Sequence, residues 1–316
     1  MKSLVKVNNS VATVSTQKID ELVDSFLRSQ DVKQSSKLLY GRTLKQYFAW
    51  VKEKKYLLSE IARPQLIEFK EEKLSSGLSS LTVGSYITAV RRFYEWLEAN
   101  KYYPNVAKAI KSPKRKQQFK KQPLLPSQAT ELLNHFHATA SSSLRDFAII
   151  NLLLRTGLRT VEVVRASVED LTYKGSQRVL LIQGKGRDEK DNFVILTDKT
   201  YQPIAEYLAT RGKVNGSEPL FTSTSNNNSG ERLSTRTISF IAKEGLKAIG
   251  LNEKAFTAHS LRHTTAVNIL RAGGSLETAQ FTLRHSNPAT TMIYTATLNE
   301  ERRLQNSGEA LLDSLY

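Results

Sequence analysis

The deciding stretch of this sequence is His259-Ser260-Leu261-Arg262-His263, which is followed by His285 and, nine residues later, by Tyr294. Upstream, residues 156–162 read TGLRTVE and contribute a second arginine, Arg159. Two separated arginines, several histidines and one candidate tyrosine nucleophile are side chains that suit phosphate chemistry. The interpretation of the rest of the chain starts from this set.

Displacement of an oxygen from a phosphodiester explains why such residue types would be gathered. The reaction builds negative charge on the nonbridging oxygens, and two guanidinium groups can hold these oxygens with forked, charge-assisted hydrogen bonds. Lysine cannot reproduce that fork. A tyrosine hydroxyl is a weak nucleophile near neutral pH, which gives the histidines a role in proton transfer. A phosphotyrosine bond would conserve the energy of the broken phosphodiester bond, so the strand could be resealed without a nucleotide cofactor.

Five motifs in this order resemble those of the tyrosine recombinases, also called phage-type integrases, over about residues 18–297. The family pattern is a T-G-L-R-x-x-E segment, a lysine in a β-hairpin, H-x-L-R-H, L-G-H, and a tyrosine nine residues after that histidine. Carried onto this chain, the pattern marks the catalytic residues Arg159, Lys185, His259, Arg262, His285 and Tyr294.

The resemblance implies a site-specific DNA recombinase that needs neither a metal ion nor ATP. Tyr294 would attack a phosphodiester to give a 3′-phosphotyrosyl link and a free 5′-hydroxyl. Arg159, Arg262 and His285 would stabilise the transition state. Lys185 would be the acid for the departing 5′-oxygen, a contribution on the order of 10²–10⁴ in rate.

One more catalytic residue and two supporting residues have roles in this interpretation. His259 would share the proton transfers with the hairpin lysine. Glu162 lies three residues after Arg159, on the same helical face, where it can hold the guanidinium by a salt bridge. We expect His263 to lie beside the catalytic residues rather than among them, and we assign no function to the two remaining histidines, His135 and His137.

Two positions depart from the family pattern. Leu283-Arg284-His285 has an arginine where family members usually have glycine. We expect the side chain either to crowd the loop or to add a phosphate contact. The lysine hairpin, residues 184–192, is about two residues longer and more acidic than the commonest form, so Lys190 competes with Lys185 for the catalytic position.

The composition supports a nucleic-acid partner independently of the motifs. The chain has 46 Lys and Arg against 30 Asp and Glu, a net charge of +16 and a pI near 9.8, which is typical of DNA or RNA binders. Residues 101–122 contain no acidic residue, and we expect this run to follow a phosphate backbone. The predicted DNA contacts are Lys108, Lys111, Lys114, Arg115, Lys116, Lys120 and Lys121.

Hydrophobic periodicity predicts two domains in a mainly α-helical fold with a small β-hairpin or sheet. Four helices within residues 16–110 resemble the core-binding domain of the family, and we assign their aromatic stripes, Tyr47 with Trp50 and Tyr94 with Leu97, to packing. A basic linker at 111–123 would lead to a mixed α/β catalytic domain at 124–297, in which Gly157 ends a helix and residues 177–183 and 192–196 form the hairpin. Together the two domains would form a C-shaped clamp on DNA. Residues 1–15 would be flexible.

The resemblance also implies an assembly. Four protomers on two DNA duplexes, each carrying an inverted-repeat core site, would exchange strands through a Holliday junction. The segment 298–316, with Leu298, Leu304, Leu311 and Leu312, resembles the tail that family members lend to a neighbouring protomer. About 15 residues before the first helix leave no room for an added arm-binding domain, which favours an Xer-like or transposon-resolving recombinase.

Other classes are less consistent with the sequence. A type IB topoisomerase shares the arginines, the histidine and the tyrosine, but H-x-L-R-H and the tail favour a recombinase. A DNA-binding protein without catalysis is disfavoured by the complete residue set. The chain has no cysteine, no visible signal peptide, no run long enough for a membrane span and no metal-ligand cluster, so we expect a cytosolic bacterial or archaeal protein without a cofactor.

Overall fold

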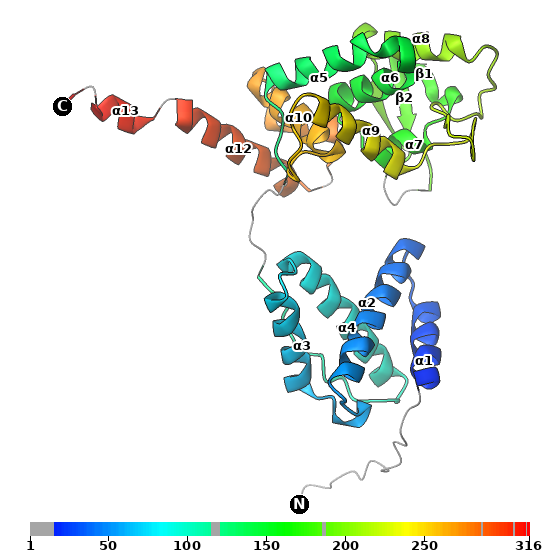
Figure 1. Ribbon diagram of the computed structural model, residues 1–316, viewed down its shortest axis with the longest axis vertical. Coiled ribbons are helices and arrows are strands. Elements are labelled where there is room, and N and C mark those ends of the chain that lie inside the picture. The colour runs from blue at the N-terminus through cyan, green and yellow to red at the C-terminus, as the bar shows by residue number, and fades with distance from the viewer. Residues whose placement is uncertain (1–15, 115–120, 185–187, 286, 306, 314) are drawn as a thin grey trace, which may run out of the picture. The chain divides into compact units, whose positions relative to one another are not determined.

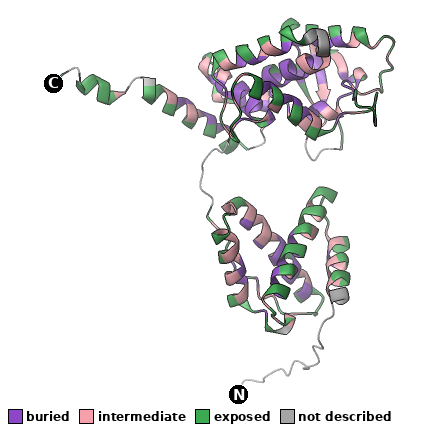
Figure 2. Cartoon of the chain, viewed as in Figure 1, coloured by how far each residue is buried: buried purple, intermediate pink, exposed green. Residues whose placement is uncertain are grey.

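The computed structural model describes residues 16–114, 121–184, 188–285, 287–305, 307–313 and 315–316. The chain divides into two compact units, Met1–Gln118 and Phe119–Tyr316 (Figure 1). Both are mainly helical, as predicted, and each has its own hydrophobic core (Figure 2). Several sequence predictions fall outside the described residues, namely the flexible segment 1–15, Arg115, Lys116, Lys120 and Lys185.

The first unit is a helical bundle built from α1 (Thr16–Ser29), α2 (Gln34–Glu53), α3 (Arg63–Ser75) and α4 (Ser80–Ala99), with a short 3-10 turn, η1 (Leu58–Glu60), before α3. Helix α4 packs against the other three helices. The aromatic stripes lie in the core as predicted, and the hydroxyls of Tyr47 and Tyr94 form a buried hydrogen bond of 2.8 Å. Ser79 caps α4 by accepting from Thr82 N, as a helix N-cap should.

Leu39 corrects one detail of the predicted bundle. The hydrophobic pattern of residues 39–51 predicts Leu39 on the same helical face as Tyr47 and Trp50, but Leu39 is 46% exposed. At this end of α2 the contact with α1 is made by Gly41, where an added Cβ would lie 3.2 Å from Leu27. Positions two residues apart in a helix point to opposite sides, so Leu39 faces away from α1.

The second unit begins with α5 (Pro126–Ala138) and α6 (Ala140–Thr156) and continues through α7 (Thr160–Arg165) and the 3-10 turn η2 (Val168–Asp170). A three-stranded antiparallel sheet follows, in the order β1 (Leu171–Lys174), β2 (Gln177–Ile182), β3 (Asn192–Ile195). The predicted hairpin is β2–β3, in which Leu180 pairs with Val194. The sequence did not predict β1, which pairs with β2 at the edge of the sheet.

Three further helices complete the main core of this unit. They are α8 (Asp198–Thr210), α9 (Thr235–Ala248) and α10 (Ala258–Arg271). Helix α6 contacts α5, α8, α9 and α10. It contributes a buried run from Ala148 to Leu154 that is apolar except for Asn151. Because α6 is central, the turn at its C-terminal end is held firmly between its neighbours.

A separate hydrophobic cluster joins α10 to α11 (Leu276–Leu283) and α12 (Ala289–Gln305). It includes Val267 from α10, Leu283 from α11, and Tyr294 and Leu298 from α12. The last helix, α13 (Gly308–Asp313), has no buried residue. Leu298 was predicted to belong to an exchanged tail, but it packs inside its own unit and is 8% exposed, whereas Leu304, Leu311 and Leu312 are exposed.

Candidate active site

The turn between α6 and α7 places Arg159. Gly157 ends α6 in the left-handed conformation, with φ of 61°, as predicted. A Cβ there would lie 2.6 Å from Leu283 Cδ2, so only glycine fits both the angle and the space. Arg159 is the N-cap of α7 and Glu162 lies in its first turn. The predicted salt bridge is present: Arg159 Nη1 donates to Glu162 Oε1 at 2.8 Å, and Arg159 N donates to Oε2 at 2.7 Å.

The second arginine, Arg262, lies on α10 and is 2% exposed. Its Nη1 donates to the carbonyl oxygen of Gly157 and its Nη2 to that of Leu283. Burial, with the nearby charges of Arg159 and Arg284, lowers the pKa of Arg262 to about 9. The guanidinium therefore stays charged at neutral pH. It keeps further N–H donors for a substrate, since a guanidinium has five.

Two histidines of α10 lead from the surface to the tyrosine. His259 is exposed, and its ring lies 4.7 Å from that of His263, edge to face. His263 is buried, and its ring lies 5.2 Å from that of Tyr294. Burial, then the neighbouring His259 and Arg262, lower the pKa of His263 to about 3. Partial burial and the charge of Arg262 also lower the pKa of His259, so both rings are neutral near pH 7.

His285 approaches the tyrosine from the other side. Its ring is stacked on that of Tyr294 with centroids 6.2 Å apart and an angle of 17° between the planes. His285 Nδ1 and the hydroxyl of the buried Thr291 share a hydrogen bond of 2.9 Å, which orients the ring and leaves Nε2 for a substrate. Burial and the arginine charges lower the pKa of His285 to about 4.

Tyr294 lies on α12 between these two histidines and is 3% exposed. Burial raises the pKa of its hydroxyl, while the charges of Arg262 and Arg159 act in the opposite direction. The charges of these two arginines favour the phenolate, which is the attacking form of the hydroxyl.

Arg284, which stands where the family has glycine, has both terminal guanidinium nitrogens bonded within the protein. It ends α11 in the left-handed conformation, with φ of 54°. Its Nη2 donates to Glu162 Oε2 at 3.0 Å and its Nη1 to the carbonyl oxygen of Thr282 at 2.6 Å. The side chain is 11% exposed. Sequence reasoning missed this pairing, because Glu162 lies 122 residues upstream of Arg284 and no local spacing indicates it.

The hairpin is described on both sides of Lys185, which itself lies outside the described residues. Lys190, its competitor, donates to both carboxylate oxygens of the buried Asp170, at 2.7 and 2.8 Å. Arg165 Nη1 donates to the carbonyl oxygen of Gly184 at 3.0 Å and so ties the first half of the loop to α7. The structure thus gives Lys190 a partner inside the protein.

The predicted DNA contacts of the basic run are described in part. Lys108, Lys111 and Lys114 are exposed. Lys121 donates to the carbonyl oxygen of Lys254 at 2.6 Å, within the second unit. Among the side chains that the structure describes, no group of three His, Asp or Glu residues is arranged to hold a metal ion.

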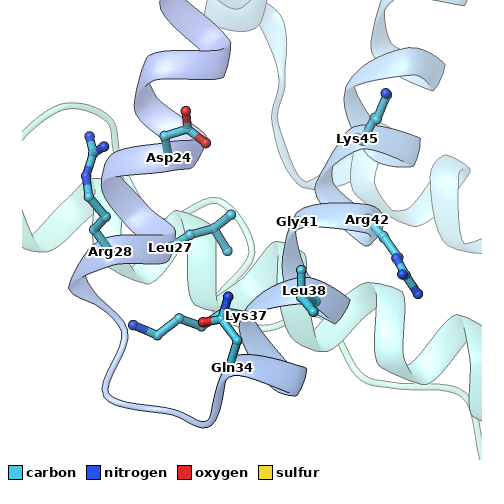
Figure 3. Close-up of a pocket in the computed structure, with 9 residues that line it drawn as sticks. All are labelled: Asp24, Leu27, Arg28, Gln34, Lys37, Leu38, Gly41, Arg42 and Lys45. Carbon is cyan, nitrogen blue, oxygen red and sulfur yellow. The ribbon is translucent and has the colours of Figure 1, made fainter. Parts of the chain in front are cut away.

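The first unit contains a groove between α1 and α2 that sequence reasoning missed (Figure 3). Four of its lining residues are basic and one is acidic. A helical projection of α2 would have indicated the basic side, because three of these residues recur at helical spacing. The lining residues are Asp24, Leu27, Arg28, Gln34, Lys37, Leu38, Gly41, Arg42 and Lys45.

Comparisons with known proteins agree with this arrangement. Residues 123–301 match the phage integrase family, and residues 19–101 match the N-terminal SAM-like domain of phage integrases. A tyrosine recombinase of Pseudothermotoga lettingae is 27% identical over 282 residues, which cover 88% of this chain and 93% of that protein. Tyrosine recombinase XerC of Thermodesulfovibrio yellowstonii is 31% identical over 265 residues, which cover 81% of this chain and 83% of the relative.

The fold has a close counterpart among solved structures. The XerH site-specific recombinase, bound to palindromic difH substrate in a post-cleavage complex, superposes with a TM-score of 0.73 at 20% identity. The match covers 92% of this chain and 84% of that one. Fold and sequence together define an enzyme that breaks and rejoins DNA. The chain belongs to the phage integrase family, and it is a tyrosine recombinase that acts by site-specific recombination. In the described part of the chain, no helix combines the length and apolar character needed to cross a membrane.

Proposed function

We propose that Tyr294 is the nucleophile of this recombinase and that Arg159 and Arg262 hold the phosphate under attack. The observation that carries the proposal is the position of Tyr294, whose ring contacts His263 and His285. Burial raises the pKa of its hydroxyl, and the charges of Arg262 and Arg159 oppose that rise. Because Tyr294 is 3% exposed in the DNA-free chain, α12 has to shift before the hydroxyl can reach a phosphate.

In the proposed cleavage step, Tyr294 Oη bonds to phosphorus while the bond from phosphorus to the 5′-oxygen breaks. The phenolic proton passes to the neutral imidazole of His259, whose lowered pKa keeps it unprotonated at neutral pH. The 5′-oxygen takes a proton from Lys185 and leaves as a hydroxyl. His285 Nε2 donates to a nonbridging oxygen, since Nδ1 is engaged by Thr291. Rejoining is the reverse of these transfers.

The choice of Lys185 over Lys190 is supported by the contacts of Lys190. An ammonium group held by both oxygens of a buried aspartate is stabilised in its charged form and is a poor proton donor. Its partner Asp170 also accepts from Ser167 N at 2.7 Å and is therefore fixed. Lys190 then anchors the second half of the hairpin loop, and Lys185 reaches the DNA.

We propose that the basic surfaces of both units hold the duplex, as a clamp in which the exposed Lys108, Lys111 and Lys114 follow the phosphate backbone. The groove between α1 and α2 adds Arg28, Lys37, Arg42 and Lys45 to this surface. These contacts position the chain on DNA, whereas base contacts would select the sequence.

The proposed assembly is a homotetramer on two duplexes with inverted-repeat sites, which exchanges strands through a Holliday junction. It is supported by the leucines of α12 and α13, Leu304, Leu311 and Leu312, whose side chains are exposed. The likeness to Xer-type relatives favours an Xer-like or transposon-resolving role in the cytosol of a bacterium or archaeon, where the DNA lies.

The test of the nucleophile uses a duplex selected by the chain from a random-sequence library and then nicked beside the cleavage position, so that cleavage traps the covalent complex. Tyr294→Phe should bind this duplex like the wild type and form no covalent complex. Tyr207→Phe is a matched control, because Tyr207 is also buried but lies on α8, where its hydroxyl bonds to Thr222. A covalent complex with Tyr294→Phe would overturn the assignment.

A further inference from the structure

Arg284 has a backbone conformation that needs an explanation. Its φ of 54° lies in the left-handed region, which is unfavourable for residues other than glycine and persists where the surroundings enforce it. Glycine would serve at this turn without strain. Any advantage of arginine at this position must therefore come from the contacts of its side chain.

Glu162 is shared by two arginines. One carboxylate oxygen accepts from Arg159 Nη1, and the other accepts from both Arg159 N and Arg284 Nη2. Glu162 is 1% exposed and Arg284 is 11% exposed, so this ion pair is shielded from water, whereas Arg159 is 31% exposed. Burial acts to raise the pKa of the carboxyl, but Arg284 and then Arg159 outweigh it and keep the pKa below its ordinary value. The acid is charged and fully engaged.

The two segments joined by this pairing are the ones that carry catalytic residues. Arg284 immediately precedes His285, and Glu162 holds Arg159. Arg262 bridges the same two segments, because it bonds to the carbonyl oxygens of Gly157 and Leu283. The guanidinium groups of Arg284 and Arg262 therefore both link the loop that carries Arg159 to the turn that carries His285.

We propose that Arg284 is a positioning residue for strand cleavage, which acts through Glu162 to fix the Arg159 guanidinium relative to His285. The inference rests on the catalytic roles proposed above. A direct contact between Arg284 and the phosphate is disfavoured, because both terminal nitrogens are engaged inside the protein. The remaining nitrogen, Nε, is buried and has no hydrogen-bond partner among the described residues.

The test measures single-turnover cleavage of the nicked duplex at saturating protein, with DNA affinity and melting temperature measured in parallel. Arg284→Gly relieves the backbone strain, so its melting temperature and its DNA affinity should stay close to the wild type. Its cleavage rate should fall about ten- to a hundredfold, as expected when a reacting group is misplaced. Arg284→Lys can still pair with Glu162 and should recover part of this loss.

A double variant shows whether Arg284 acts through Glu162. If it does, Arg284→Gly combined with Glu162→Gln should cleave no more slowly than Glu162→Gln alone, whereas independent roles would multiply the losses. Multiplied losses, an unchanged rate in Arg284→Gly, or a loss confined to DNA affinity would each overturn the inference.

Two controls separate this outcome from other failures. Arg211→Ala removes an arginine of matching burial, which pairs with Glu218 and bonds to the carbonyl oxygen of Pro219, and it should cleave at the wild-type rate. Failure of the proposed function would be visible separately, as a covalent complex in Tyr294→Phe or as none in the wild type.

Discussion

At the scale of single residues, the proposed active site is a set of neutral imidazoles beside charged guanidinium groups. The pKa values of His263 and His285 lie at about 3 and about 4, below the ordinary value of 6.5. Neutral rings at pH 7 can accept a proton or donate one hydrogen bond without adding repulsion to the arginines. The same shift links the stability of the fold to pH.

The direction of that link follows from the lowered pKa values. As pH falls below about 6.5, the unfolded chain protonates both rings before the folded chain does, so the free energy of unfolding should fall. Between pH 7 and pH 5.5 we expect a loss of about 1 kcal/mol from the buried His263 and less from the half-buried His285. Urea unfolding at the two pH values measures it, and His263→Gln should reduce the difference. Equal stability of the wild type at both values would contradict the prediction.

The sequence was informative about residues whose partners are close along the chain. The pairing of Glu162 with Arg159 follows from a spacing of three residues at the start of a helix, and the left-handed Gly157 follows from its place after an apolar helix. The partner of Arg284 could not be predicted in this way. It depends on the contact between the C-terminal end of α11 and the first turn of α7, which is decided by the folded core rather than by any local pattern.

At the scale of elements, both candidate lysines, Lys185 and Lys190, lie in the sequence between β2 and β3 of the hairpin. Its strands were predictable because β-branched and aliphatic residues flank a Gly-Lys-Gly turn. Strand β1 was not, because its four residues, LTYK, are half-buried or exposed and lack a buried alternation. The salt bridge between Lys190 and Asp170 could not be predicted from the sequence, for the same reason as the pairing of Arg284. No local spacing indicates it, because it joins η2 to the far side of the hairpin loop.

Substitution of the two lysines should therefore have different effects. Lys190→Met leaves the buried Asp170 without its cation and should lower the free energy of unfolding by about 1–3 kcal/mol, while cleavage of the nicked duplex continues. Lys185→Met should keep its stability and lose on the order of 10²–10⁴ in cleavage rate. Urea unfolding and single-turnover cleavage measure the two effects. The reverse pattern would assign the catalytic proton to Lys190.

At the scale of the whole molecule, the C-terminal helices divide into an anchored part and an exposed part. Leu298 packs with Tyr294, and Glu301 forms an ion pair with Arg271 of α10 at 2.6 Å. Beyond them, Leu304, Leu311 and Leu312 are exposed. The sequence showed the apolar spacing of this tail but not where the anchored part ends, because burial of Leu298 depends on α10 and α11.

A truncation after Arg303 tests the exchanged tail without disturbing the anchored part. The shortened chain should melt like the wild type and bind a single half-site, but it should fail to pair two full sites, because the leucines that would dock on a neighbour are gone. Truncation after Thr297 is the comparison, since it also removes Leu298 and Glu301 and should lower the melting temperature. Normal recombination by the first truncation would refute a tail shared between protomers.

The shared carboxylate at position 162 also makes two positions of this chain mutationally dependent. Glu162 pairs with both Arg159 and Arg284. A buried guanidinium without a counter-charge is strongly destabilising, so loss of Glu162 would remove the acid from two cations at once. With glycine at position 284, the same loss would affect Arg159 alone. Arg284 therefore makes Glu162 harder to replace.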